Sequence, residues 1–99
     1  MLHIINKSPY DRNSLDAVLR LATQGSTVLL IEDGVYAAMS GTTSEAKIKS
    51  AMAGLKFYAL KPDMDARGIS NRAMDGVSLV DYGGFVDLVA EQPNCQSWL

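Results

Sequence analysis

Cys95 is the residue of this chain with the most direct route to covalent chemistry. A thiolate can attack a sulfur donor and carry a persulfide, provided that a nearby cation or a helix N-terminus favours the charged form. The neighbours Asn94, Gln96 and Ser97 are neutral, and no Lys, Arg or His follows Arg72. Free cysteines are also among the most buried residue types. We therefore expect a structural role for Cys95, with sulfur transfer as the alternative.

Two other features carry titratable groups. The adjacent carboxylates of Glu32 and Asp33 could serve acid–base catalysis, but neighbouring positions need not face each other. A helix cap at Asp33 and a turn at Gly34 explain the same residues with fewer assumptions. His3 lies in a short apolar run, where a lone histidine is more often a hydrogen-bonded core residue than a base or a ligand. Neither feature predicts a catalytic centre.

The polar segment after the first apolar run contains Lys7, Ser8, Tyr10 and Arg12. If that run is a strand of an open parallel sheet, the segment lies at the carboxyl end of the strand, where ligands bind in such sheets. An ordinary polar loop fits the same residues, and we favour that interpretation.

Nucleotide and metal motifs are absent from the sequence. It contains no GxGxxG, no GxxxxGK[ST] and no GxSxG pattern, so neither a nucleotide cradle nor a nucleophile elbow is indicated. One Cys and one His are too few for an internal disulfide or a CxxC-type zinc site. We expect no cofactor and no metal.

The composition is that of one small globular domain spanning residues 1–99. Hydrophobic residues make up 47%, which supports a core, and no apolar run approaches the ~20 residues that span a bilayer. Nine Lys and Arg against eleven Asp and Glu leave a net charge of −2, which disfavours direct binding of nucleic acid. The N-terminus lacks the pattern of a signal peptide, so we expect a cytoplasmic protein without membrane contact.

Short apolar runs alternate with helix-like segments, which predicts an α/β fold with a parallel sheet and helices on both faces. The helix after Ser14 has an apolar stripe at Leu15, Val18, Leu19 and Ala22. The predicted strands are 2–6, 27–31, 55–60, 77–80 and 95–99. The other predicted helices are 35–39, a stretch from Ser44 to Gly54, 63–67, and one after Asp81 that turns Phe85, Leu88 and Val89 inward.

Several short blocks, in order along almost the whole chain, resemble the TusB/DsrH family. They are Met1-Leu2-His3, Asn6-Lys7-Ser8-Pro9, the block from Leu29 to Ala38, Tyr58-Ala59-Leu60, Asp65-Ala66-Arg67-Gly68, Val80-Asp81-Tyr82 with Phe85-Val86, and Gln96-Ser97-Trp98-Leu99. The resemblance implies a three-layer α/β/α fold of the DsrEFH type. Its five-stranded parallel sheet would place the last strand beside the first.

The same resemblance implies a small subunit of a cytoplasmic sulfur-relay complex. In TusBCD, persulfide sulfur passes toward 2-thiolation of the wobble uridine of certain tRNAs. In DsrEFH, sulfur is handled during dissimilatory oxidation. The implied partners are TusC/DsrF-like and TusD/DsrE-like subunits in a heterohexamer, with the principal sulfur-carrying cysteine on the TusD/DsrE-like subunit.

One departure from the family pattern bears on the role of this chain. Some DsrH-type members carry a cysteine in the first helix, near the positions of Ala17, Val18 and Leu19, and none is present here. This favours a non-catalytic, TusB-like role. The alternatives are a DsrH-like subunit, a sulfurtransferase that uses Cys95, and a homo-oligomeric or ligand-binding α/β module.

An interaction subunit needs contact residues outside the stripes that form its core. Large apolar and aromatic side chains are favoured there, because they contribute contact area at a small entropic cost. The candidates are Val35, Tyr36, Met39, Tyr82 and Trp98.

Overall fold

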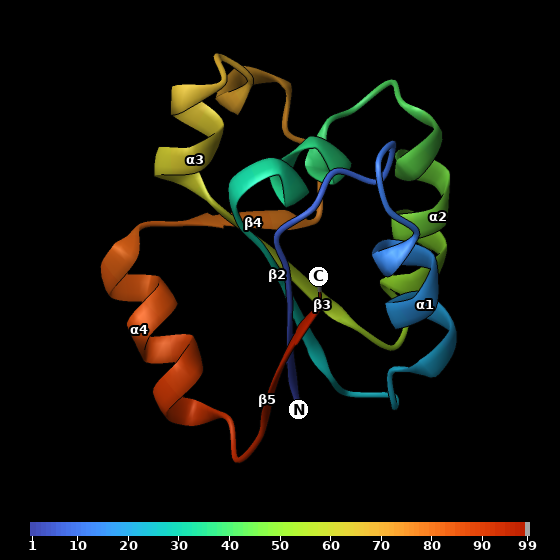
Figure 1. Ribbon diagram of the computed structural model, residues 1–99, viewed down its shortest axis with the longest axis vertical. Helices are drawn as coiled ribbons and strands as arrows, with labels where there is room; N and C mark the ends of the chain where they lie inside the picture. Colours follow the sequence, from blue (N-terminus) through green and yellow to red (C-terminus); the bar gives the residue numbers. More distant parts are fainter. Residues whose placement is uncertain (99) are drawn as a thin grey trace.

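The computed structural model describes residues 1–98, and within them five strands form one parallel sheet (Figure 1). They are β1 (Leu2–Ile5), β2 (Thr27–Leu30), β3 (Lys56–Leu60), β4 (Val77–Val80) and β5 (Cys95–Trp98). Their order is β4-β3-β2-β1-β5, so the last strand lies beside the first. All five predicted strands are confirmed to within a residue or two at their ends. Leu99, the last residue of the predicted strand 95–99, lies outside the described residues.

The helices follow the predicted segments with shifted ends. They are α1 (Ser14–Leu21), the 3-10 helix η1 (Glu32–Ala38), α2 (Thr43–Ala51), α3 (Lys61–Ala66), the 3-10 turn η2 (Ser70–Arg72) and α4 (Tyr82–Glu91). The helix predicted over 35–39 begins earlier, at Glu32, and η2 was not predicted. None of these helices, which cover the described part of the chain, is long and apolar enough to cross a membrane.

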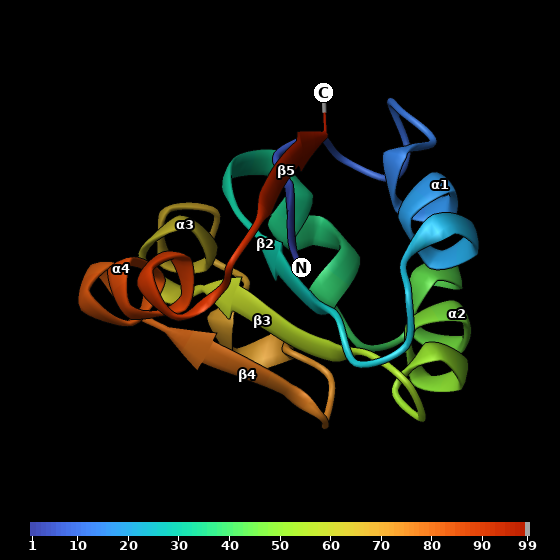
Figure 2. The same ribbon diagram turned by 90° about the horizontal axis from the view of Figure 1, so that it is seen from below.

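The direction of the crossovers explains how the helices divide between the two faces. The chain steps from β1 to β2 and on to β3 in one direction, so right-handed crossovers place α1 and α2 on the same face. It then returns from β4, at one edge, to β5 at the other edge, and this return carries α4 across the opposite face. Figure 2 shows α1 and α2 on one side of the sheet and α4 on the other.

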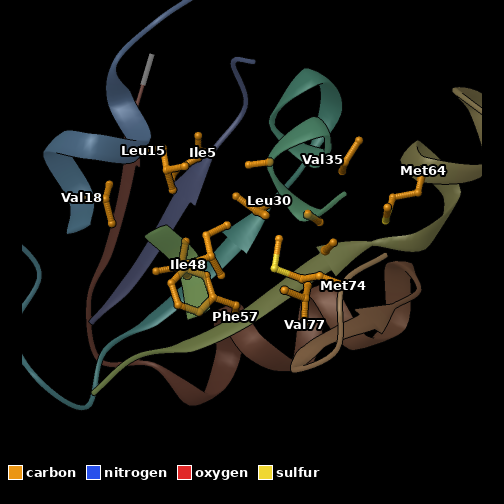
Figure 3. Close-up of a cluster of buried hydrophobic side chains, with 14 of the residues drawn as sticks. Ile5, Leu15, Val18, Leu30, Val35, Ile48, Phe57, Met64, Met74 and Val77 are labelled. Carbon is orange, nitrogen blue, oxygen red and sulfur yellow. The ribbon is translucent and has the colours of Figure 1, made fainter. Parts of the chain in front are cut away.

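Two clusters of buried side chains fill the space between these layers. The larger one joins α1, α2 and η1 to the sheet through residues such as Leu15, Ile48 and Val35 (Figure 3). The smaller one places Leu88 of α4 against Leu2, Ile4 and Leu29. The central strands β1 and β2 are therefore buried on both faces, as strands inside a parallel sheet usually are. The edge strand β5 is largely exposed.

Candidate functional site

Cys95 lies at the start of β5, and its side chain is exposed. The expectation that Cys95 is buried was wrong. β5 is an edge strand that pairs with β1 alone, with Cys95 beside Leu2, so no neighbouring strand covers its outer side. A local sequence pattern contains no strand order, and for this reason it does not reveal that β5 is an edge.

The surroundings of the Cys95 thiol supply little to activate it. Within the described residues, no hydrogen bond or ion pair involves the thiol, and the residues beside it along β5 are neutral. A reactive cysteine sits in an electropositive, partly exposed environment because a nearby positive charge favours the thiolate. Cys95 meets the condition of exposure and lacks a bonded cation or base.

His3 and Trp98 tie β5 to β1. The indole Nε1 of Trp98 donates a hydrogen bond of 3.1 Å to Nδ1 of His3, and the two rings lie 6.0 Å apart. His3 is buried, and this burial, together with the positive charge of the N-terminus, lowers its pKa. The ring is therefore neutral at pH 7 and accepts at Nδ1. The interpretation of His3 as a hydrogen-bonded core residue is confirmed.

The two carboxylates Glu32 and Asp33 have separate surroundings. Nε and Nη2 of Arg67 both donate to Oδ1 of Asp33, at 3.0 and 2.8 Å, and this bond raises the pKa of the guanidinium. Arg67 also donates from Nη1 to the carbonyl oxygen of Asp63 and lies 6.0 Å from the Tyr36 ring. Asp33 thus links η1 to α3, and the helix cap predicted for it was wrong. The pair does not form an acid–base site.

Gly34 fixes η1 against the end of β1. A Cβ at this position would overlap the carbonyl oxygen of Ile5 and lie 2.9 Å from its carbonyl carbon. The amide of Ile31 donates to the same carbonyl oxygen at 3.0 Å. Only a residue without a side chain allows this approach, so Gly34 has a role in packing beyond the predicted turn.

The segment after β1 folds as a self-contained loop. The Ser8 hydroxyl accepts from the backbone N–H of Tyr10, and the Ser8 carbonyl accepts from the backbone N–H groups of Asp11 and Arg12. Tyr10 is exposed. Ser8 is buried, and its hydrogen bonds stabilise the turn. These contacts fit the favoured interpretation, an ordinary polar loop.

Comparison with known proteins decides the family. A family model described as "DsrH like protein" matches residues 7–95. Protein TusB of Pectobacterium parmentieri is 37% identical over 98 residues, which cover 99% of this chain and all of that protein. Protein TusB of Escherichia coli is 36% identical over the same coverage. The chain belongs to the DsrH/TusB family. This is a family of sulfur-relay subunits, as the sequence resemblance implied.

A solved structure of lower sequence identity shows the same fold. The crystal structure of the ychN protein from Escherichia coli superposes with a TM-score of 0.78 and covers 98% of this chain and 97% of its own. At 20% identity, this likeness concerns the fold alone. It agrees with the three-layer α/β/α arrangement expected for the DsrH/TusB family.

The interface candidates do not form one patch on this DsrH/TusB chain. Val35 is fully buried in the larger core cluster, so its assignment to a surface was wrong: its side chain packs inside the subunit. Tyr36 and Met39, in and just after η1, are partly buried, and Tyr82 is 62% exposed. Trp98 is on β5, at the sheet edge opposite β4 and the start of α4. Contact with a partner remains a prediction for these four residues.

The sequence reasoning missed an exposed apolar stripe on α4. Val89 was expected to face inward, yet it is 38% exposed, and Val86 is 64% exposed. Phe85 and Leu88 alone face the smaller cluster. The signal was present in the sequence, because Tyr82, Val86 and Val89 recur at i, i+4 and i+7 beside the inward pair. We call these three residues the α4 outer stripe.

Two hollows in the described surface lie away from the carboxyl ends of the strands. The first, of about 340 Å³, is lined by the ends of α1 and α2 and by the residues before β3, and the second, of about 410 Å³, borders the amino ends of β3 and β4. Lys56 is the only charged residue that lines either of these two pockets. In open parallel sheets, ligands bind at the carboxyl ends instead. The described residues contain no group of three or more metal-binding side chains.

Proposed function

We propose that this chain is a non-catalytic subunit of a TusBCD-type sulfur-relay complex. One observation carries the proposal: a chain that matches TusB along its whole length has a single thiol, which sits on an edge strand without a bonded cation or base. The subunit completes and shapes the assembly, and a partner carries the sulfur.

In this proposal the complex passes persulfide sulfur toward 2-thiolation of the tRNA wobble uridine in the cytoplasm. The partners are TusC-like and TusD-like subunits. The net charge of −2 supports a role that leaves tRNA to other components, because binding of nucleic acid depends on neutralising phosphates. Tyr36, Met39, Tyr82 and Trp98 are candidates for contacts with these subunits.

Reconstitution tests the proposal. The chain is mixed with the TusC-like and TusD-like subunits of its own organism, and the mass of the product is measured by sedimentation and native mass spectrometry. We expect a hetero-oligomer that contains all three subunits, a heterohexamer by analogy with the family. A chain that stays apart while the other two subunits associate would refute the proposal. A product made of this chain alone would favour the homo-oligomeric module.

The exposure of Cys95 favours a second candidate function, a sulfurtransferase that uses this thiol. The chain is incubated alone with a labelled persulfide donor, and persulfides are then trapped by alkylation and located by mass spectrometry. A sulfurtransferase would acquire labelled sulfur on Cys95. We expect no label above that found on a denatured control.

A further inference from the structure

β5 leaves one edge of the sheet open. It is the last strand in the order β4-β3-β2-β1-β5 and pairs with β1 alone, so its outer side meets no other strand within residues 1–98 (Figure 2). Natural proteins usually block such an edge with a charged side chain, a proline or a bulge, because an open edge binds further strands. Cys95, Gln96 and Ser97 are neutral and exposed, and Pro93 lies before the strand. The edge of β5 is therefore open to the addition of a strand.

The backbone groups on the outer side of β5 belong to Cys95 and Ser97. The amide of Leu2 donates to the carbonyl oxygen of Asn94 at 2.9 Å, so Asn94 points its carbonyl group toward β1. Backbone groups alternate between the two sides along a strand, so Gln96 also points toward β1, while Cys95 and Ser97 point away from it. Nε2 of Gln96 contacts the carbonyl oxygen of Ser97 at a long 3.5 Å. Cys95 and Ser97 thus each offer an N–H donor and a carbonyl acceptor to a second strand.

These backbone groups complement those of a second copy in a register centred on Gln96. When two β5 strands run antiparallel with their Gln96 residues facing each other, Cys95 of each strand faces Ser97 of the other, and the facing residues exchange N–H and C=O groups. A register with the two Cys95 residues facing each other would set Ser97 against Pro93, which has no N–H. The facing Gln96 side chains are compatible, because an amide both donates and accepts hydrogen bonds.

Charge favours this edge of the sheet over the other one for pairing between identical chains. β4 is flanked by the exposed carboxylates of Asp75 and Asp81. Two antiparallel β4 strands centred on Ser78 would set Asp75 of each copy opposite Asp81 of the other, and like charges that lie directly opposite destabilise a strand pair. Residues 92–98 carry no charged side chain. Two copies of β5 therefore approach without this repulsion.

We propose that the outer edge of β5 pairs antiparallel with β5 of a second copy of this chain, so that the two sheets join into one. The contact is short and lies at the small end of protein interfaces, so the dimer is in equilibrium with the monomer. This inference goes beyond the proposed function and stands apart from it, because pairing through the sheet edge leaves the helices on both faces of the sheet available to other subunits.

A matched pair of variants tests the backbone pairing. Ser97→Pro removes an outward N–H from each copy and keeps the bonds to β1, since proline is tolerated on the open side of an edge strand. Ser97→Ala keeps that N–H. Association of the full chain is measured by sedimentation equilibrium over a wide range of concentrations, with circular dichroism to check folding. We expect a concentration-dependent wild-type dimer, which Ser97→Pro weakens roughly ten- to hundredfold and Ser97→Ala leaves within about twofold.

Engineered cysteines test the register. In a Cys95→Ser background, Gln96→Cys places two thiols at facing positions with Cα atoms about 4.5 Å apart, within the range of a disulfide. Asn94→Cys in the same background is the control, because its two thiols would lie roughly 13 Å apart along the strands, too far for a disulfide. We expect oxidation by glutathione disulfide to link the Gln96→Cys chain into a covalent dimer, with little dimer from Asn94→Cys, on non-reducing gels.

A second substitution covers the case in which Ser97→Pro unfolds the chain. Gln96→Lys would set two lysines opposite each other and should abolish the dimer, as lysines do at natural sheet edges. Ser78→Lys places the same charge at an exposed residue of the other edge strand, β4, and should leave the dimer within about twofold.

Each outcome supports or overturns the pairing. A wild-type chain that stays monomeric overturns it and leaves the proposed function intact. A dimer that folded Ser97→Pro or Gln96→Lys chains retain overturns β5 as the contact, and equal cross-linking of Gln96→Cys and Asn94→Cys overturns the register. Larger assemblies that Ser78→Lys abolishes would show that β5 pairs with β4 of the next copy, which also overturns the proposal. Failure to join the TusC-like and TusD-like subunits would refute the proposed function and leave this pairing intact.

Discussion

Lowering the pH from about 7 to about 5 should destabilise this protein through one residue, His3. His3 is the only histidine of the chain, it is 5% exposed, and its Nδ1 accepts the indole N–H of Trp98. Burial, and to a smaller extent the positive N-terminus, lowers its pKa below the ordinary 6.5. Protonation at Nδ1 would also remove the acceptor that holds β5.

The direction of the pH effect on the free energy of unfolding follows from whether the folded or the unfolded chain binds the proton more readily. Below pH 6.5 the unfolded chain takes up a proton on His3, while the folded chain does not until the lower, folded pKa is reached. The stabilisation is therefore complete above pH 6.5 and is lost as the pH falls below it. The free energy of unfolding should fall by at most about 1.4 kcal/mol per pH unit in this window. Ordinary carboxylates titrate mainly below about pH 5, so they contribute little.

Urea denaturation at several pH values measures this slope, with His3→Gln as the control. The Gln side chain keeps an acceptor and does not titrate, so the unfolding free energy of the variant should stay nearly flat between about pH 7 and 5. Parallel pH profiles for the wild type and His3→Gln would refute the reasoning.

Three further changes have defined outcomes in urea denaturation at neutral pH. Gly34→Ala should lower the free energy of unfolding by roughly 3 kcal/mol or more, since its Cβ would collide with the backbone of Ile5; a loss below about 1 kcal/mol would contradict that packing. Asp81→Ala removes the α4 cap and should cost about 1 kcal/mol, whereas Asp81→Asn should retain most of the stability. Cys95→Ser should change the stability by less than about 0.5 kcal/mol because the thiol is exposed; a larger loss would indicate a buried thiol.

Local pattern predicted the elements of the fold well. The run 27–31 is apolar without alternation, which is typical of a strand that is buried on both faces. This pattern predicts the strand without any knowledge of the strands beside it. The 3-10 form of η1 was not predictable in the same way. It depends on Glu32 at a φ of 50°, on Gly34 against Ile5, and on Arg67, which is distant in sequence. The placement of the last strand beside the first came from the family resemblance, and the structure confirms it.

The candidate site was predicted less well, because exposure depends on strand order and on helix rotation. Cys95 was expected to be buried and is exposed, since β5 is an edge. Val35 was expected at the surface and is buried, because η1 packs closely against the end of β1 at Gly34 and Val35 joins the larger core cluster. Val89 was assigned to the inner side of α4, but the cap at Asp81 and the contact at Gly84 turn it outward. In each case the exposure of the side chain is set by packing between elements that lie apart in the sequence, which a local sequence pattern does not describe.

The flow of labelled sulfur through the reconstituted relay tests the central claim most directly. Three assemblies are compared: the complete complex, the complex with Cys95→Ser, and the partner subunits without this chain. A non-catalytic subunit predicts nearly full transfer with Cys95→Ser and a sharp loss when the chain is omitted. Label trapped on wild-type Cys95, with transfer lost in a Cys95→Ser complex that still folds and assembles, would contradict the account and identify the chain as a sulfurtransferase.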